Sequence, residues 1–502
     1  MPEILVIKKG AQAMEKHTSR REFIKVIGQG ILGASFLSPL SKCTQRPKKP
    51  NVVLILVDDL GWKDLGCYGN QYYETPNIDL LCQDSMKFTN AYASCAVCSP
   101  TRAAILTGRY PTRHGITDWI HHWIKPDPNQ QPTGYSGGKK QKLLTPANHL
   151  YMEHEEKTIA ELLKDQGYAT CHVGKWHLGR ERWYPETQGF DENIGGYEQG
   201  HPNSYFSPYK NPELKDGEKN EYLVDRLGKE AVDFISNANQ KDKPFFLYMS
   251  HYAVHTPIQS KKDLIEYFKN KDIPENRDFH PEYAAMIKSL DQAAGNIISK
   301  LKKLDVYNDT VIIFTGDNGG LKLPRGESEY YWTDNSPLRA GKGYPYEGGI
   351  REPFMIRIPG LTKAGTESDA IINSIDVLPT VCDLTPAQLP QNTKIDGKSI
   401  VPIIKGRQEE DERTLFWHFP HYWAGGVVAP YSAVRSGKWK MVKWYEDNVI
   451  ELYNLKKDIG ETNDLSEKFP EVVKKLDQKL SDWLQETGGE LPKPNPDYQA
   501  NA

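Results

Sequence analysis

Four apolar segments constrain the fold of this chain more than any other feature. The first, residues 51–57 (NVVLILV), consists of β-branched residues and leucine after an initial asparagine. Continuous apolar runs of this length are typical of strands that are buried on both faces of a parallel sheet. Related runs occupy residues 168–173, 244–249 and 310–314. We therefore predict an α/β fold with a central, mostly parallel or mixed sheet that is sandwiched by helices.

Polar side chains follow two of these segments. Asp58 and Asp59 come directly after the first segment, and Asp317 and Asn318 come shortly after the last. Ligands of open α/β sheets bind at the carboxyl ends of strands, where carboxylate and amide oxygens suit Ca²⁺ or Mg²⁺ rather than Zn²⁺. An aspartate pair here also fits a helix N-cap with a solvated neighbour. The residues alone leave both interpretations open.

A third constraint is the stretch 98–109 (CSPTRAAILTGR). Pro100 suits the first turn of a helix, which places Arg102 near the start of that helix. A cysteine at a helix N-terminus lies in a field that favours anions, so Cys98 is a candidate nucleophile in an anion-binding site. Cys95 and Cys98 also form a CxxC pair. A redox or metal role for that pair requires a thioredoxin-like context or a second ligand pair, and the sequence contains neither.

Three further blocks carry basic side chains or histidines. Taken alone, each block also fits a basic or structural loop. The blocks are GKWHLG at 174–179 with Lys175 and His177, HYAVHTP at 251–257 with His251 and His255, and RAGKG at 339–343 with Lys342.

Together these motifs resemble those of the type I sulfatases, a family of the alkaline phosphatase superfamily. The resemblance rests on C-x-P-S/T-R…L-T-G-R, G-K-x-H-x-G, H-x-P and R-x-G-K-G…Y-E-G-G-I-R-E-P, and it extends over nearly the whole chain after residue 50. It implies that Cys98 is oxidised by a formylglycine-generating enzyme to formylglycine (3-oxoalanine), whose hydrate is the nucleophile. It also implies that Ca²⁺ is bound by Asp58, Asp59, Asp317, Asn318 and residue 98.

The resemblance implies roles for the basic residues as well. Arg102 helps to orient the nucleophile, and Lys175 and Lys342 bind the sulfate oxygens. His255 protonates the leaving oxygen, and His177 is a base that helps to release sulfate. Glu347 and Arg351, in the last motif, are interpreted as structural.

Aromatic and histidine-bearing loops are candidates for contact with the organic part of the substrate. The candidates are His201, Tyr205, His251 and His421, although packing within the loops explains them equally well. Residues 119–150 are predicted to form a long surface loop beside the site, where specificity is often determined. The expected substrate is a sulfated saccharide, with sulfated galactose or N-acetylgalactosamine preferred. The alternatives are a phosphodiester or phosphonate monoester hydrolase of the same superfamily and a non-catalytic sulfoglycan-binding protein.

Length and the N-terminal segment complete the prediction. A chain of 502 residues with a net charge of −3 is too long for one small core and lacks the basic excess that nucleic-acid binding requires. Residues 19–25 (SRREFIK) and the apolar run 26–40 resemble a twin-arginine export signal. We therefore expect export to a bacterial periplasm or cell surface, with membrane contact only through this signal or a lipid anchor at Cys43.

The predicted organisation has three parts. Residues 1–50 are the export signal and linker, and residues 51–410 are the catalytic domain. Short aromatic segments from about residue 413, followed by an amphipathic pattern at 469–487, predict a small C-terminal subdomain over 411–502. We expect that subdomain to be an antiparallel sheet with a packed helix.

Overall fold

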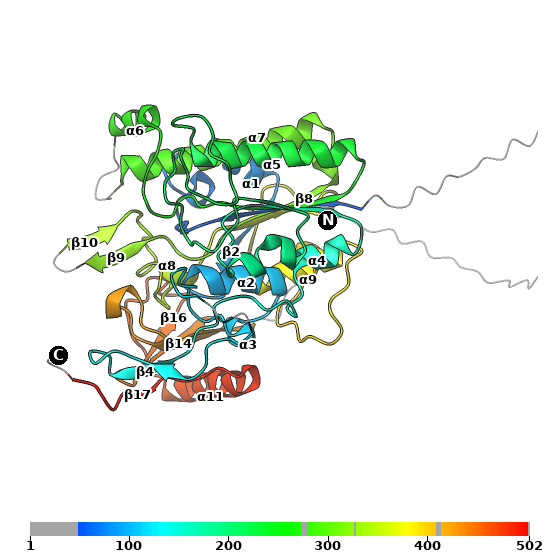
Figure 1. The fold of residues 1–502 in the computed structure, drawn as a ribbon. Helices are drawn as coiled ribbons and strands as arrows, with labels where there is room; N and C mark the ends of the chain where they lie inside the picture. The colour runs from blue at the N-terminus through cyan, green and yellow to red at the C-terminus, as the bar shows by residue number, and fades with distance from the viewer. Residues whose placement is uncertain are drawn as a thin grey trace, which may run out of the picture. The chain divides into compact units, whose positions relative to one another are not determined.

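Eight strands form a central sheet in the computed structural model (Figure 1). Neighbouring strands from β8 to β6 all pair in parallel, whereas β11 is antiparallel to both of its neighbours. Every residue of β1 and β8 is buried, which explains why these strands lack the alternation of a half-exposed sheet. The predicted α/β fold is confirmed. In spatial order the strands are β12 (Thr366–Asn373), β2 (Met86–Tyr92), β11 (Phe354–Arg357), β8 (Thr310–Gly316), β1 (Asn51–Val57), β7 (Phe245–Ser250), β5 (Ala169–Gly174) and β6 (Glu192–Ile194).

Helices cover this sheet on two sides (Figure 1). One layer contains α1 (Pro76–Gln83), α5 (Leu223–Gln240), α6 (Lys262–Lys269) and α7 (Pro281–Lys303), and the other contains α2 (Cys98–Thr107), α4 (Ile159–Lys164) and α9 (Val377–Leu384). The start of α4 shows how the local sequence sets a boundary. Thr158 accepts a hydrogen bond from the backbone of Glu161, and the Glu161 side chain accepts one from the backbone of Thr158, which forms a capping box.

A second sheet of four antiparallel strands follows in the C-terminal part, as predicted. One of its faces, with Val434 and Met441, packs against α11 and against Ala104 of α2. The other face, with Ala433 and Val442, packs against residues of the large sheet and of α8 (Glu347–Ile350). The small sheet is therefore buried between these layers. Its elements are β13 (Thr414–Phe419), β14 (Tyr431–Ser436), β15 (Trp439–Trp444), β16 (Val449–Asn454) and α11 (Pro470–Thr487).

Short elements fill the connections. The predicted long loop at 119–150 contains β3 (Tyr135–Ser136) and β4 (Leu143–Pro146), and β17 (Lys493–Pro494) near the end of the chain pairs with β4. A hairpin of β9 (Lys322–Arg325) and β10 (Ser328–Tyr331) follows β8. The remaining short α-helices of the described ranges are α3 (Pro111–His114) and α10 (Val401–Ile404).

The structure describes residues 49–125, 127, 129–272, 279–325, 328–407 and 413–499. The expected export signal and the expected boundary between residues 410 and 411 lie outside these ranges. By its contacts the chain divides into Met1–Pro47 and one unit from Lys48 to Ala502. The proposed division into a catalytic domain and a C-terminal subdomain stays a prediction. Within the described ranges, each helix is too short or too polar to cross a bilayer.

Candidate active site

The predicted site residues follow strands that lie side by side in the large sheet. Asp58 and Asp59 follow β1, and Asp317 and Asn318 follow β8, its parallel neighbour. Because parallel strands end at the same edge of a sheet, these side chains meet there, as the rule for open α/β sheets predicts. The same edge receives Lys175, which directly follows β5, and His251 and His255, which follow β7.

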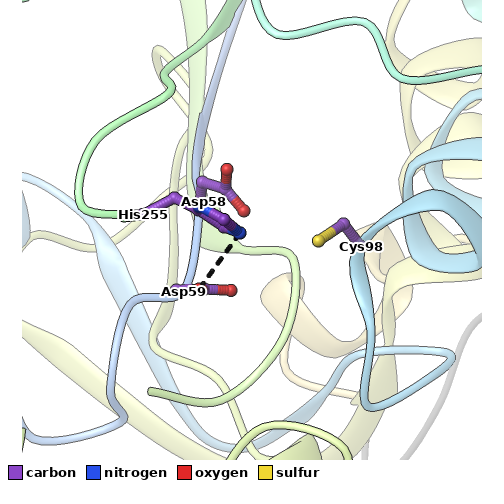
Figure 2. Close-up of side chains that lie close together, drawn as sticks. All are labelled: Asp58, Asp59, Cys98 and His255. Carbon is purple, nitrogen blue, oxygen red and sulfur yellow. Dashed lines mark ion pairs between the residues drawn. The ribbon is translucent and has the colours of Figure 1, made fainter. Parts of the chain in front are cut away.

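Cys98 faces this edge from the first residue of α2 (Figure 2). The candidate ligand atoms of Asp58, Asp59, Cys98 and His255 all lie within 4.8 Å of one another. Lys342 joins them, because its Nζ atom is 3.4 Å from Cys98 Sγ. The structure therefore brings the candidate nucleophile, two carboxylates, a histidine and a lysine to one point.

Three ion pairs hold the base of the site together. One of the three cations is the buried guanidinium of Arg102. In addition to its ion pair, it donates hydrogen bonds to the Ser250 hydroxyl at 2.7 Å and to the Lys175 carbonyl oxygen at 3.0 Å. It therefore links the ends of several strands to α2. The pairs are Lys175–Asp58 at 2.8 Å, Lys342–Asp59 at 2.5 Å and Arg102–Asp317 at 2.7 Å.

These ion pairs do not involve every side-chain oxygen atom of the site. Asp58 Oδ1, Asp59 Oδ2 and Asn318 Oδ1 are buried and have no hydrogen-bond partner in the described part of the chain. Burial raises the pKa of Asp58 to about 8 although Lys175 opposes this rise. Bare oxygen atoms of this kind are what a hard divalent cation binds. The donor set therefore fits Ca²⁺ or Mg²⁺.

Asp317 differs from the other predicted metal ligands. Its Oδ2 atom lies against the Arg102 guanidinium, and its Oδ1 atom accepts a hydrogen bond from the Asp59 backbone at 3.2 Å. Both oxygens are thus occupied in this structure, whereas His255 lies in the compact group of candidate ligands. The role of Asp317 as a metal ligand stays a prediction.

The two predicted acid–base histidines have different environments. His255 Nδ1 is 2.8 Å from the Thr256 carbonyl oxygen, which leaves Nε2 in the site at 3.7 Å from Asp59 Oδ2. His177 Nε2 is 2.8 Å from the Ile120 carbonyl oxygen, and its Nδ1 has no partner among the residues that the structure describes. Burial holds the pKa of both imidazoles well below its usual range, although Asp59 opposes this effect at His255.

Two of the candidate substrate contacts lie near His255. The His201 ring is parallel to the His255 ring with 6.2 Å between their centroids. Tyr205 is fully buried, and its hydroxyl lies 2.7 Å from the Tyr252 carbonyl oxygen and 2.9 Å from that of His255. Because these backbone contacts occupy the hydroxyl, we reassign Tyr205 from substrate contact to positioning of the segment that carries His255.

The other two candidates are enclosed by protein. His251 is fully buried, neither ring nitrogen has a partner in the described ranges, and burial lowers its pKa to about 3. His421 Nε2 is 2.8 Å from Thr117 Oγ1, next to the predicted loop. A contact of either histidine with substrate stays a prediction.

Sequence reasoning missed two supporting residues. Ser250, the last residue of β7, accepts from Arg102 and donates to the Lys175 carbonyl oxygen. The sequence does mark Ser250, because it is a polar residue at the end of an apolar run. Ile120 donates from its backbone to Ser99 Oγ at 3.0 Å and accepts from His177. No sequence pattern indicates this contact, because it uses only backbone atoms of Ile120.

Comparison with known proteins identifies the family. Residues 50–387 match the model of the family described as Sulfatase, and residues 340–486 match one described as N-sulphoglucosamine sulphohydrolase, C-terminal. The chain is 31% identical to a sulfatase of Formosa agariphila over 92% of this chain and 94% of the relative. It is 32% identical to N-acetylgalactosamine-6-sulfatase of Canis lupus familiaris over 79% of this chain and 72% of the relative.

A solved crystal structure is also similar to this chain. The crystal structure of Ps i-CgsB in complex with k-i-k-neocarrahexaose matches with a TM-score of 0.71 and 29% identity, over 90% of this chain and 94% of that one. The family match includes the strands β1, β5, β7 and β8 and the helix α2, which together carry most of the site. The chain therefore belongs to the sulfatase family and is a sulfuric ester hydrolase.

Proposed function

We propose that the protein hydrolyses sulfate monoesters of saccharides, with formylglycine derived from Cys98 as nucleophile and with Ca²⁺ bound at Asp58 and Asp59. One observation carries this proposal: the reactive atoms of Asp58, Asp59, Cys98 and His255 lie within 4.8 Å of one another. A nucleophile position, cation-binding carboxylates and a proton carrier thus occur at one point, beside the Nζ atom of Lys342.

The charge balance of the site supports a divalent cation. Lys175 and Lys342 are paired with Asp58 and Asp59, so each lysine shares its charge between its carboxylate and a bound anionic ester while these pairs persist. A cation at the two carboxylates would take over their neutralisation and release both lysines for the sulfate oxygens. Bound there, Ca²⁺ supplies electrostatic stabilisation of the charge that develops on the ester.

The environment of Cys98 argues against the unmodified thiol as the nucleophile. Burial raises the pKa of the thiol to about 11, although Lys175 and Lys342 oppose this rise. A thiol with this pKa is protonated at neutral pH and is therefore a weak nucleophile. Formylglycine at position 98 supplies a hydrated aldehyde, in which one hydroxyl is the nucleophile and the second provides a route for sulfate release.

The remaining residues position the ester and move protons. Lys175 and Lys342 bind the non-bridging sulfate oxygens, and Arg102 keeps Asp317 and the end of β5 in place. The hydrogen bond from His255 Nδ1 to the Thr256 carbonyl directs Nε2 towards the leaving oxygen. Nε2 donates a proton to that oxygen from the imidazolium form of His255, which the negative charge of a bound sulfate ester favours. His177 Nδ1, which has no other partner in the described chain, accepts a proton from the hydroxyl at position 98.

The named relatives support a saccharide substrate. One relative is an N-acetylgalactosamine-6-sulfatase, and the structural neighbour was solved with k-i-k-neocarrahexaose. We therefore propose a sulfated sugar of galactose or N-acetylgalactosamine type. The proposed maturing partner is a formylglycine-generating enzyme.

Sulfate release from a panel of substrates tests this function. The panel contains regiospecifically sulfated monosaccharides, a sulfated oligosaccharide and a phosphodiester, each measured with and without chelator. The protein is produced together with a formylglycine-generating enzyme, and conversion of Cys98 is confirmed by mass spectrometry. We expect chelator-sensitive release from a sulfated galactose or N-acetylgalactosamine. Turnover of the phosphodiester alone would establish the alternative hydrolase, and binding of sulfoglycan without turnover would establish the non-catalytic alternative.

Two cysteine variants sharpen the test. Cys98→Ser has one hydroxyl at this position, so it is expected to be inactive or to accumulate a covalent sulfo-enzyme that mass spectrometry detects. Cys95→Ser is the matched control, because Cys95 is equally buried and belongs to the same CxxC pair. We expect Cys95→Ser to retain activity. Full turnover by Cys98→Ser would contradict the proposed nucleophile.

We also propose that the protein is exported to the periplasm or cell surface. The support is the SRREFIK motif and the apolar run at 26–40, which lie outside the described residues. Fusion of residues 1–50 to a reporter, followed by cell fractionation, tests this. A reporter that stays in the cytoplasm would contradict export, and radiolabelled lipid on a Cys43-dependent product would show anchoring.

A further inference from the structure

A row of aromatic rings leads away from His255. The first ring is His201, which is parallel to His255 at a centroid distance of 6.2 Å. His122 meets His201 edge-on at 5.7 Å, and Trp123 meets His122 edge-on at 4.9 Å. Trp123 is 60% exposed, so the row connects the proposed proton donor with the surface.

The outer end of this row is a cluster of rings, which we term the aromatic platform and define as Trp119, His121 and Trp123. The centroid distances are 4.0 Å between Trp119 and His121, 4.8 Å between His121 and Trp123, and 5.3 Å between the two tryptophans. Trp119 and His121 are partly exposed. The rings support one another and present aromatic surface to solvent.

Backbone contacts attach the platform to the reactive centre. Between Trp119 and His121, Ile120 binds Ser99, the neighbour of Cys98, through its N–H and His177 through its carbonyl oxygen. A guanidinium nitrogen of Arg180 donates to the carbonyl oxygen of His122. The distance from the platform to residue 98 is therefore set by hydrogen bonds rather than by a free loop.

We propose that the aromatic platform binds the sugar ring that adjoins the sulfated sugar, so that the preferred substrate is an oligosaccharide. This inference rests on the proposed function, since it concerns the same substrate. The organic part of the ester must extend from the leaving oxygen, which lies beside His255. The rings that connect His255 with the surface are His201 and then, through His122, the platform.

The chemistry of the platform fits an uncharged sugar. Aromatic rings offer flat apolar surface, on which the C–H groups of a pyranose face pack, while its hydroxyls remain free to bind water or polar groups. Burial lowers the pKa of His121 and of His122, so both rings are neutral near pH 7. The platform itself thus provides little positive charge for a second sulfate.

Matched substrates test the inference in the matured, Ca²⁺-loaded enzyme. The kcat/KM is measured for one sulfated monosaccharide and for an oligosaccharide that carries the same sulfated sugar beside neutral sugars. For Trp123→Ala we expect a fall of about threefold to tenfold on the oligosaccharide, mainly through KM, and no change on the monosaccharide. Trp123→Phe is expected to retain most of the activity, because it keeps a ring.

A surface control separates stacking from general damage. Tyr267→Ala, in α6, removes an aromatic side chain of similar exposure, 52%, and is expected to change neither rate. An equal fall of both substrates for Trp123→Ala would assign Trp123 a merely structural role. An unchanged rate on the oligosaccharide would also overturn the inference.

A binding measurement makes the result independent of catalysis. The probe is a chemically desulfated galactose-type hexasaccharide, and the readout is the intrinsic tryptophan fluorescence of the wild-type protein and of Trp123→Phe. A saturable change in the wild type that is reduced in Trp123→Phe supports the platform even if no sulfated sugar is hydrolysed. Absence of a change in the wild type overturns the inference, whatever the substrate panel shows.

Discussion

Two buried ionic clusters in this protein differ in how completely their central carboxylates are paired. In the framework cluster, defined as Glu347, Arg351, Lys440 and Glu461, both oxygens of Glu347 are used. Lys440 contacts one at 2.9 Å, and Arg351 contacts the other at 2.7 Å. In the active-site cluster, defined as Asp58, Asp59, Asp317, Arg102, Lys175 and Lys342, an oxygen of Asp58 and one of Asp59 have no hydrogen-bond partner in the described chain.

The pKa values of Glu347 and Asp58 differ in this way, although each cluster also contains a carboxylate that is shifted in the other direction. Burial raises the pKa of Glu461 to about 7, whereas Lys342 and His255 outweigh burial at Asp59 and hold its pKa below the usual range. Burial opposes the ionisation of Glu347, but Lys440 and Arg351 outweigh it and hold the pKa of Glu347 below its usual range. At Asp58, burial outweighs Lys175 and raises the pKa to about 8. The paired carboxylate of Glu347 joins parts of the fold, whereas the unpaired oxygens of Asp58 and Asp59 lie at the proposed cation site.

The largest expected effect tests whether the framework cluster stabilises the fold. Lys440→Met leaves Glu347 and Glu461 without their shared lysine, because Lys440 also contacts Glu461 at 2.8 Å. Removing one partner of a buried pair costs about 3–5 kcal/mol, so we expect the free energy of unfolding to fall by this amount in urea titrations.

The matched control lies on the same strand. Lys443 in β15 pairs with Asp477 at 2.8 Å, but its side chain is 24% exposed. Lys443→Met is expected to cost less than about 1 kcal/mol. If both variants were destabilised equally, burial would not explain the role of Lys440.

A smaller effect is expected at the active site, and on activity rather than stability. Lys342→Met removes a cation from the proposed sulfate site, so we expect kcat/KM to fall by about 10²–10³. The free energy of unfolding of the Ca²⁺-loaded variant should change much less than that of Lys440→Met. Lys342→Arg, which keeps the charge, should retain more activity. A large loss of stability without loss of activity would place Lys342 with the framework cluster.

The effect that is smallest per unit of change concerns pH. In the chelated protein, Asp58 binds a proton in the folded state between pH 3.8, its ordinary pKa, and about 8, whereas the unfolded chain has released it. Folding stability should therefore decrease as pH rises through this range, by up to about 1.4 kcal/mol per pH unit. Asp58→Asn should remove this contribution in thermal unfolding, and added Ca²⁺ should suppress it in the wild type. A slope that is the same in Asp58→Asn would contradict the assignment.

The sequence predicts the buried strands well, for a physical reason. Burial on both faces excludes polar residues from 51–57, and the aspartates that follow mark the edge of the sheet, so the predicted segment coincides with β1. The antiparallel sheet of β13 to β16 was also predicted, because turns separate its short aromatic strands. The antiparallel strand β11 and the short strands β3, β4 and β17 contain too few residues for their pattern to show pairing or direction.

The sequence predicts which residues belong to the site, but not which of them form ion pairs with one another. Lys175 and Asp58 meet only because β7 lies between β1 and β5 in the sheet, and neither residue carries information about that order. For the same reason the burial of Tyr205 against the backbone of His255 was not predicted. Local patterns identify the chemical groups, whereas the order of the strands determines which groups touch.

The burial of α2 has a consequence for the time course of biosynthesis. Cys98 is 3% exposed, and Ala104 in the same helix packs in one cluster with Val434, Met441 and Leu480. These covering residues are translated long after position 98. We therefore expect the proposed oxidation of Cys98 to occur before the C-terminal part closes over α2. The fraction of active protein in a cell would then depend on how quickly this maturation proceeds relative to translation and folding.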